Sequence, residues 1–385
     1  MRVEEGGIEL EIPGESTEGI EEAVFYNPRQ ELNRDITIGV LRAMQTERPA
    51  LETYLDAMTA SGVRGIRSAA DGWTVTCCDR SQEAVALTSE NLELNGFTPV
   101  EPPQATGSRV GVVRRDAAAL MRESHFDVVD LDPFGSPMSV IDAAVSAADE
   151  LLCVTATDTA PLCGAHLASG IRSYGAVPRN TEYHPEMGVR ILLGALVRSG
   201  ARFDVALTPV LTHATSHYVR TYLELDHRAT AADEALESLG YLTHCRDCLH
   251  RSASQGLVPV LEDRCSACGS ETVTHAGPLW LDSTHDRTVV AGVREELPDS
   301  FGSAETARRL LTSLESELHR PTHYDQHVLC KQWGLPANAM DEFLEAIEGA
   351  GFDTSRTHYG GTTFKTDATV DQIREATIPD LERAG

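Results

Sequence analysis

The sequence has 385 residues, which is enough for two domains with a sizeable core. Its 59 acidic and 32 basic side chains give a net charge of −27, and only Lys331 and Lys365 are lysines. This composition looks like that of proteins from extreme halophiles, and at about 1 M salt the Debye length falls to roughly 3 Å, so an acidic surface does not exclude a nucleic-acid partner.

No apolar run is long enough to span a bilayer, and residues 1–5 lack the basic and apolar regions of a signal peptide. We therefore expect a cytoplasmic protein without membrane contact.

A loop followed by a helix is predicted near the amino end. The segment Val24–Asp35 contains a proline and an Asn-Arg-Asp cluster, and Ile36–Met44 has apolar residues at helical spacing. Arg34 would then lie at the start of the helix and could hold a carboxylate, while Phe25 could stack on a base. The alternatives are a solvated Arg34 and a Phe25 that only packs against the helix.

The next segment has the order of a doubly wound nucleotide site. The predicted elements are a strand at Thr53–Leu55, a turn at Asp56–Gly62, a helix at Val63–Ala70 and a strand at Thr74–Cys78. Asp79 follows the second strand and would bond ribose hydroxyls, although such a residue can also cap a helix. The turn lacks the G-x-G-x-x-G pattern, so a cofactor without a pyrophosphate, such as S-adenosylmethionine, fits better.

Two more predicted strands end in acidic residues. Val110–Val113 is followed by Asp116, which could bond an adenine amino group or cap a helix. The Val-rich run Phe126–Leu131 ends in a tight turn that begins at Asp132. Open α/β sheets bind ligands at the carboxyl ends of their strands, so these acids point to a ligand site.

The Asp132-Pro133-Phe134 turn resembles the Asp/Asn-Pro-Pro-aromatic turn of methyltransferases that act on exocyclic amino groups of nucleobases. Such an amine is a poor nucleophile and needs a hydrogen-bond acceptor that can take its proton, together with an aromatic face for the base. Asp132 would be the acceptor and Phe134 the face. Asp130 could also be the working acid, or the turn could be purely structural.

Several longer motifs carry a family resemblance. They are Val24–Pro28 with Asn33–Asp35, Leu55–Arg67, Asp130–Pro137, Thr155–Gly164, Ser355–Tyr359 and Lys365–Asp367. Together they look like the archaeal and eukaryotic tRNA guanine-26 N2-dimethyltransferases, over most of the chain. The resemblance implies transfer of one or two methyl groups from S-adenosylmethionine to guanine N2 at position 26 of tRNA.

The resemblance also implies roles for individual residues. It places the methionine part of the cofactor on Arg34 and Arg64, the ribose on Asp79, and the adenine on Asp116 and Ala117. It makes Asp132 the acceptor for guanine N2 and surrounds the flipped base with Phe25, Pro133 and Phe134.

Four of the nine cysteines have the spacing of a metal site. Cys245 and Cys248 form one C-x2-C pair, Cys265 and Cys268 form another, and 16 residues separate the pairs, within the usual range of about 15–20 for four-thiolate zinc sites. Four thiolates leave no open position for water, so the zinc would be structural. Disulfides are disfavoured in the cytosol.

The last third of the chain is predicted to form a winged-helix-like module. Helical spacing occurs in residues 304–318, 324–333 and 340–347, and a Gly-Gly turn at 360–361 separates two extended pieces. Arg356, His358 and Lys365 would place positive charge on the wing for tRNA binding. A packing or dimerisation domain is the alternative.

We therefore expect an α/β fold: a Rossmann-like class I methyltransferase sheet in residues 1–240, a zinc ribbon-like insert in 241–280, and a smaller α+β, winged-helix-like tRNA-binding domain in 281–385. S-adenosylmethionine and structural Zn²⁺ are the expected cofactors, tRNA is the partner, and no obligate protein partner is inferred. The alternatives are an amino-methyltransferase for another RNA or DNA base, and a catalytically idle zinc-ribbon and winged-helix nucleic-acid-binding factor.

Overall fold

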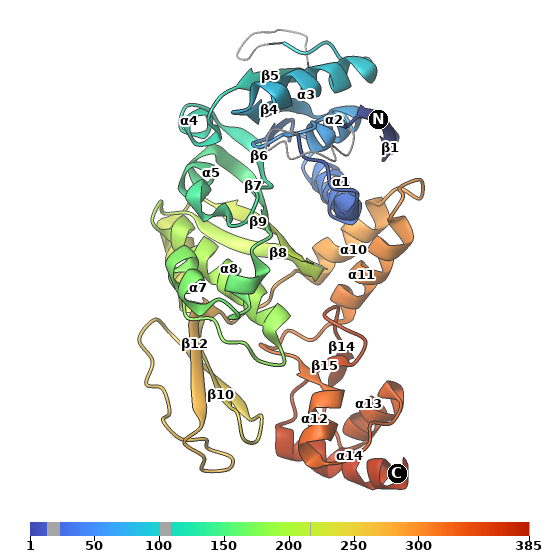
Figure 1. The fold of residues 1–385 in the computed structure, drawn as a ribbon. Coiled ribbons are helices and arrows are strands. Elements are labelled where there is room, and N and C mark those ends of the chain that lie inside the picture. Colours follow the sequence, from blue (N-terminus) through green and yellow to red (C-terminus); the bar gives the residue numbers. More distant parts are fainter. Residues whose placement is uncertain (14–23, 101–108, 216, 385) are drawn as a thin grey trace. The chain divides into compact units, whose positions relative to one another are not determined.

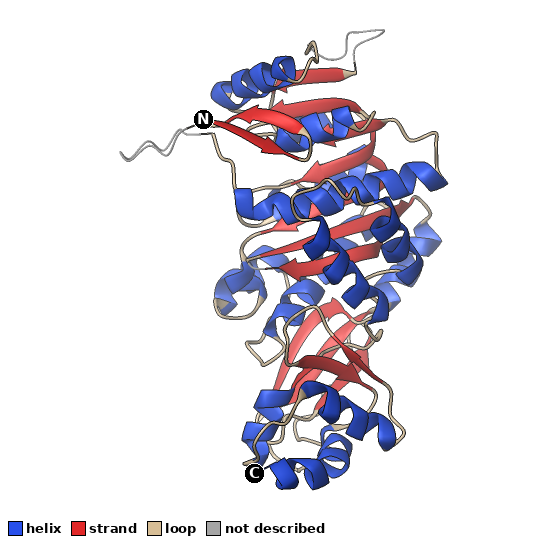
Figure 2. Cartoon of the chain, turned by 90° about the vertical axis from the view of Figure 1, so that its right-hand side faces the viewer, coloured by secondary structure: helices blue, strands red, loops and turns tan. Residues whose placement is uncertain are grey.

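The structure is a computed structural model that describes residues 1–13, 24–100, 109–215 and 217–384 (Figure 1). Within these residues the main sheet has seven strands in the order β5-β4-β3-β6-β7-β9-β8. Figure 2 distinguishes the strands, in red, from the helices, in blue. Their bounds are β3 Thr53–Asp56, β4 Thr74–Asp79, β5 Val110–Arg114, β6 Phe126–Leu131, β7 Ala148–Ala156, β8 Ala206–Thr215 and β9 Tyr218–Asp226.

The strand order reverses beside β3. The chain moves outward from β3 to β4 and β5, then returns to add β6 on the other side of β3, and these neighbours pair in parallel. Strand β7 pairs with β6, also in parallel. The reversal lies between β3 and β6, which is where open α/β sheets bind ligands. The doubly wound, Rossmann-like sheet expected from the sequence is therefore confirmed.

The chain divides into two compact units, and this division differs from the expected ranges. The first unit consists of Met1–Thr155, Arg220–Leu225 and Thr288–Thr312. Its helices are α1 Glu31–Glu47, α2 Val63–Ala70, α3 Gln82–Leu94, α4 Ala117–Met121, α5 Ile141–Ala147 and the short helices η1 Pro28–Gln30 and η2 Pro137–Ser139. It also contains most of α10 Arg287–Glu296 and α11 Ala304–Ser316.

A hairpin at the amino end was not expected. Strands β1 (Arg2–Glu5) and β2 (Ile8–Glu11) pair antiparallel. Ile8 and Leu10 are buried while Glu9 between them is exposed, so the alternation typical of a half-buried strand is present. The many glutamates in this segment hide that alternation.

The second unit consists of Ala156–Val219, Asp226–Arg287 and Ser313–Gly385. Its helices are α6 Thr159–Leu162, α7 Leu167–Tyr174, α8 His184–Ala201, α9 Ala229–Glu237, α12 Gln326–Trp333, α13 Met340–Gly349 and α14 Val370–Ala384. Its further strands form two three-stranded sheets, β11-β10-β12 and β13-β15-β14. Their bounds are β10 Leu239–Cys245, β11 Arg251–Gln255, β12 Val273–Trp280, β13 Tyr324–Asp325, β14 Thr354–Arg356 and β15 Thr363–Thr366.

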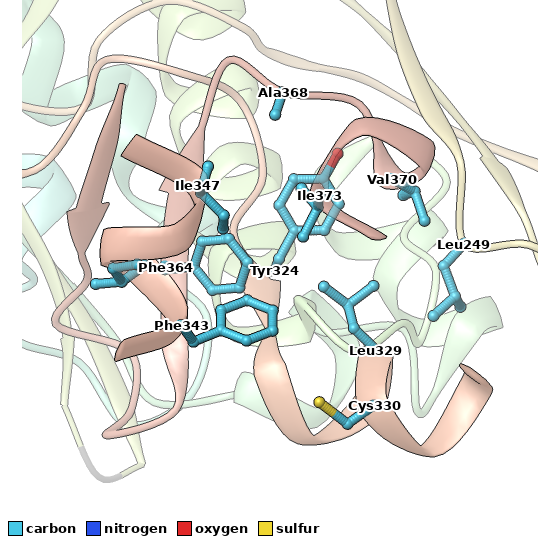
Figure 3. Close-up of a cluster of buried hydrophobic side chains, with 11 residues drawn as sticks. Leu249, Tyr324, Leu329, Cys330, Phe343, Ile347, Phe364, Ala368, Val370 and Ile373 are labelled. Carbon is cyan, nitrogen blue, oxygen red and sulfur yellow. The ribbon is translucent and has the colours of Figure 1, made fainter. Parts of the chain in front are cut away.

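One apolar cluster holds the carboxyl-terminal helices and strands together (Figure 3). Phe343 from α13 and Phe364 from β15 pack edge to face with their ring centroids 5.5 Å apart. Leu329 from α12 and Ile373 from α14 are buried in the same cluster. Leu249, which follows the Cys245–Cys248 pair, also belongs to it, so the cysteine-rich segment contributes to the core of this module.

No helix in the described part of the chain is long and apolar enough to cross a membrane.

Helix α2 lies directly against the sheet at Gly65. A Cβ atom at this position would lie 2.3 Å from Cys77 Sγ and 3.3 Å from Asp56 Oδ2. We expect Gly65→Ala to lower the free energy of unfolding by about 1–3 kcal/mol, because both neighbours are buried and must move. Equilibrium denaturation in multimolar KCl measures this change.

Gly292 provides a matched control, since it also lies in a helix but its Cβ would meet only Ala43 Cβ at 3.9 Å. Gly292→Ala should leave stability unchanged or raise it by up to about 1 kcal/mol, because alanine favours helix more than glycine does. Equal losses in the two variants would contradict the close approach of α2.

Candidate active site and metal centre

Three carboxylates lie at the carboxyl ends of β3 and β6. Asp56 ends β3 and is the register partner of Asp130 in β6, and Asp132 begins the turn that follows β6. Asp56 and Asp130 are buried, whereas the Asp132 side chain is 20% exposed. Of the three, Asp132 is therefore the one that solvent reaches.

Asp132 is held from one side by an arginine on α2. The Nε and Nη2 atoms of Arg64 donate hydrogen bonds of 3.0 and 2.7 Å to Asp132, and both bonds end on Oδ2. Among the described residues, Oδ1 of Asp132 has no hydrogen-bond partner. This oxygen can accept a hydrogen bond from a ligand without giving up the contact with Arg64.

Asp130 is enclosed by protein groups. Arg220 from β9 donates two hydrogen bonds to it, of 2.8 and 2.7 Å, and the Tyr54 hydroxyl donates a third, of 2.7 Å. Burial alone would raise the pKa of Asp130, but the guanidiniums of Arg220 and Arg64 hold it below its ordinary value. Asp130 is an ionised carboxylate whose two oxygens both bond to protein groups, and solvent does not reach it. The sequence left open whether Asp130 or Asp132 is the working acid, and this environment favours Asp132.

Asp56 has the opposite character. Burial, together with the charge of Asp130, raises the pKa of Asp56 to about 7. Its Oδ2 accepts hydrogen bonds from the Thr59 hydroxyl at 2.9 Å and from the Gly65 N–H at 3.0 Å. These bonds fix the start of α2, which carries Arg64.

Two exposed aromatic rings meet beside the turn. Phe134 is 74% exposed and Phe25 is 45% exposed. Their centroids are 4.6 Å apart with an interplanar angle of 75°, which is an edge-to-face contact. The structure thus brings together the two residues that the sequence predicted to flank a base, with Pro133 between Phe134 and Asp132.

Arg34 and Arg64 line one small hollow, together with Thr37, Ile38, Tyr54, Arg67 and Ser68. Arg34 donates to both carboxylate oxygens of Glu5, in the amino-terminal hairpin. Burial alone would raise the pKa of Glu5, but Arg34 holds it below its ordinary value. Glu5 could not be selected from the sequence, because its partner Arg34 lies in a different element.

The acids after β4 and β5 are more open. The two oxygens of Asp79 each accept one backbone N–H bond, from Ala60 at 3.1 Å and from Ser81 at 2.9 Å. The following helix is capped by Ser81, whose hydroxyl accepts from the Ala84 N–H, and not by Asp79. Asp116 caps α4 through the Ala119 N–H at 3.0 Å, and Ala117 is the first residue of that helix.

The four cysteines of the paired motifs converge. Their sulfur atoms all lie within 4.8 Å of one another, with 3.7 Å between Cys245 and Cys268 and 3.6 Å between Cys248 and Cys265. A tetrahedron of thiolates about 2.3 Å from a zinc ion has edges of about 3.8 Å. The donors therefore fit a tetrahedral zinc, and the sulfurs are too far apart for disulfides.

The expected positive wing is wrong for two of its three residues. Lys365 Nζ lies 2.8 Å from Glu317 and 3.2 Å from Glu186, and His358 Nδ1 lies 2.9 Å from Glu317. Lys365 is 2% exposed. Its charge is needed to neutralise buried glutamates, so only Arg356, which is exposed and pairs with Asp341, remains on the surface.

A family model described as N2,N2-dimethylguanosine tRNA methyltransferase matches residues 6–377. The chain is 56% identical over 379 residues to a tRNA (guanine(26)-N(2))-dimethyltransferase of Natronomonas pharaonis, covering 98% of this chain and all of the relative. It is 52% identical to the protein of the same description from Haloarcula marismortui, over 98% of this chain and all of that relative.

Among solved structures, the chain resembles Trm1 from Pyrococcus horikoshii in complex with S-adenosyl-L-methionine. The TM-score is 0.85 at 33% sequence identity, and the match covers 98% of this chain and 99% of that one.

The raised pKa of Asp56 predicts a pH-dependent stability. Its folded pKa of about 7 exceeds the unfolded value of about 3.9, so between these values the folded state retains a proton that the unfolded state has lost. This contribution is fully present below pH of about 4 and is lost as the pH rises through about 7. Asp56→Asn, which stays neutral, should therefore show a smaller fall in the free energy of unfolding between pH of about 5 and about 8 than the wild type.

Denaturation curves at constant KCl concentration measure this difference. Parallel pH dependences of the two proteins would contradict a protonated Asp56.

Proposed function

Because the chain belongs to the N2,N2-dimethylguanosine tRNA methyltransferase family, we propose that the strand ends around Asp132 form its active site. The protein is an S-adenosylmethionine-dependent tRNA (guanine(26)-N2)-dimethyltransferase, as its relatives over the full chain and the Trm1 structure indicate. The observation that carries the proposed site is the partly open Asp132 carboxylate beside two exposed phenylalanine rings.

Asp132 would act on the exocyclic amine of guanine. Its Oδ1 accepts a hydrogen bond from the N2 amino group, which draws the nitrogen lone pair out of conjugation with the ring and orients it for attack. S-adenosylmethionine supplies an electrophilic methyl group; the N–C bond forms as the S–C bond breaks. Asp132 then takes the proton that N2 releases. Arg64, fixed on Oδ2, keeps the carboxylate from turning.

Phe25 and Phe134 would hold the flipped base. Since the two rings contact each other at 4.6 Å, a base that stacks between them must first separate them. The lost edge-to-face contact is worth about 0.5–1.5 kcal/mol, and stacking on the base, worth about 1–3 kcal/mol per base, offsets it. Pro133 fixes the spacing between the Phe134 ring and the carboxylate.

The proposed cofactor contacts follow the strand ends. Arg34 and Arg64 would hold the methionine part, Asp79 would accept from the ribose hydroxyls, and Asp116 would accept from the adenine amino group. Ala117 would contribute its N–H at the start of α4. Each oxygen of Asp79 accepts one hydrogen bond from the described residues, which leaves a lone pair on each for the ribose.

The second unit is proposed to bind metal and tRNA. The sheet β11-β10-β12 with its four cysteines fits a zinc ribbon, and the sheet β13-β15-β14 with α12 and α13 fits a winged-helix-like module. Zinc would stabilise the sheet β11-β10-β12 without taking part in catalysis, because four thiolates complete the coordination of the metal. The tRNA-facing charge of this module includes Arg356.

Asp132→Asn should slow methyl transfer strongly, because a carboxamide oxygen can accept a hydrogen bond but cannot take the proton. We expect a fall in kcat of about 10²–10⁴-fold with little change in cofactor affinity. The assay uses tRNA transcripts with G or A at position 26 in multimolar KCl, followed by mass spectrometry of the nucleosides, and isothermal titration with the cofactor.

Asp149→Asn is the control, since Asp149 is an exposed carboxylate at the start of β7 and should keep the wild-type rate. Wild-type turnover by Asp132→Asn would refute the role of Asp132, and methylation that ignores position 26 would refute the substrate.

Cys265→Ser should lose the metal. A chain purified in the presence of zinc should carry about one zinc ion, and a single serine substitution should reduce its occupancy because the hydroxyl is a poor zinc ligand. Cys163→Ser, outside the cluster, should retain it. Elemental analysis of the purified proteins measures the zinc content of each variant. Equal zinc contents in the two variants would rule out the site.

A further inference from the structure

A second arginine, Arg220, contacts Asp130, the carboxylate next to the Asp132–Arg64 pair. Arg220 is fully buried in β9. Its Nη1 and Nη2 atoms donate to the two oxygens of Asp130. The same nitrogens donate to the Thr155 and Thr37 hydroxyls, at 3.0 and 3.1 Å. Its guanidinium also lies over the Tyr222 ring, 4.7 Å from the centroid.

Both guanidiniums lie near one carboxylate, Asp130. Arg64 is bound to Asp132, but its Nη1 lies only 3.9 Å from Asp130 Oδ2. It also donates to the Thr37 hydroxyl at 3.3 Å. Asp132, Arg64, Asp130 and Arg220 therefore alternate in charge from the open turn into the core, and each carboxylate has its own arginine.

Removing Arg220 would change which carboxylate Arg64 binds. Asp130 would be left as a buried carboxylate without its bidentate partner, and an uncompensated buried charge is strongly unfavourable. Arg64 is the cation nearest to it, and a movement of about 1 Å would bring Nη1 within hydrogen-bond distance. The same movement would take the Nε and Nη2 atoms of Arg64 away from Asp132 Oδ2. The orientation of Asp132 depends on these two bonds.

We infer that Arg220 is a positioning residue for methyl transfer: by neutralising Asp130, it keeps Arg64 on Asp132. The inference rests on the proposed role of Asp132. It assigns no contact with substrate or cofactor to Arg220. It goes beyond packing and stability, because it requires that Arg64 change its partner when Arg220 is removed, which a purely structural Arg220 would not require.

A double-mutant cycle separates these two cases. Arg220→Gln should lower kcat by about 10²-fold, the usual effect of a displacement of about 1 Å at a catalytic group. Asp130→Asn combined with Arg220→Gln should recover at least about tenfold of that loss, because a neutral residue 130 no longer attracts Arg64. Both proteins lack the arginine side chain, so packing cannot explain a recovery.

Arg220→Lys keeps the charge and provides a variant that should fold. It should stay well above Arg220→Gln in kcat, with the KM for tRNA unchanged. A folded double variant as slow as Arg220→Gln, or an Arg220→Gln variant with the wild-type rate, would overturn the inference. So would Arg220→Lys at the level of Arg220→Gln.

A crystal structure of a folded Arg220 variant distinguishes this inference from the function itself. In Arg220→Gln the Arg64 guanidinium should contact Asp130, and in the double variant it should return to Asp132. A guanidinium that stays on Asp132 in both would refute the inference whatever the activity, whereas a wild type that does not methylate G26 would refute only the proposed function.

Discussion

The alternating charges behind the Asp132 turn are the constraint on which the site depends. Moving a carboxylate out of water costs several kcal/mol, and the cost is offset only by well-placed partners. The partners of Asp130 come from three different elements: Tyr54 from β3, Arg64 from α2 and Arg220 from β9. The strand end at Asp130 is therefore stable only when the sheet, from β3 to β9, has already assembled around it.

The same burial explains how such a site can operate in molar salt. At about 1 M salt, charges on the surface are screened beyond roughly 3 Å, but ion pairs that exclude water are screened far less. The chain carries a net charge of −27, yet its buried pairs are balanced. Lys365, one of its two lysines, lies between Glu186 and Glu317 inside the second unit. Positive charge is thus placed where it is needed to compensate buried acids.

Local patterns were sufficient for much of the fold. The helix Val63–Ala70 has the predicted bounds, and the strand Phe126–Leu131 likewise, because apolar spacing and the residues that end each element are all in the segment itself. The cysteine cluster was predicted from spacing alone. Partners that cross the sequence were not predictable: Glu5 for Arg34, and the two glutamates for Lys365.

Arg220 did have a signal, since it interrupts the apolar alternation of a strand that reads Tyr-Val-Arg-Thr-Tyr-Leu. An arginine at such a position must have a buried acid as its partner. Which acid binds Arg220 could not be predicted from the sequence, because Asp56, Asp130 and Asp132 all lie at the carboxyl ends of the neighbouring strands β3 and β6.

The different roles of Asp56, Asp130 and Asp132 follow from their hydrogen bonds. Asp56, with a pKa of about 7, supports the start of α2, and Asp130 uses both oxygens on Arg220. Asp132 receives both bonds from Arg64 on one oxygen, so the other remains for substrate. One acceptor oxygen is also sufficient for two rounds of transfer. N2-methylguanine retains a single N–H, which can occupy the same oxygen if the methyl group points away from it, toward the gap that the two phenylalanine rings must open to admit the base.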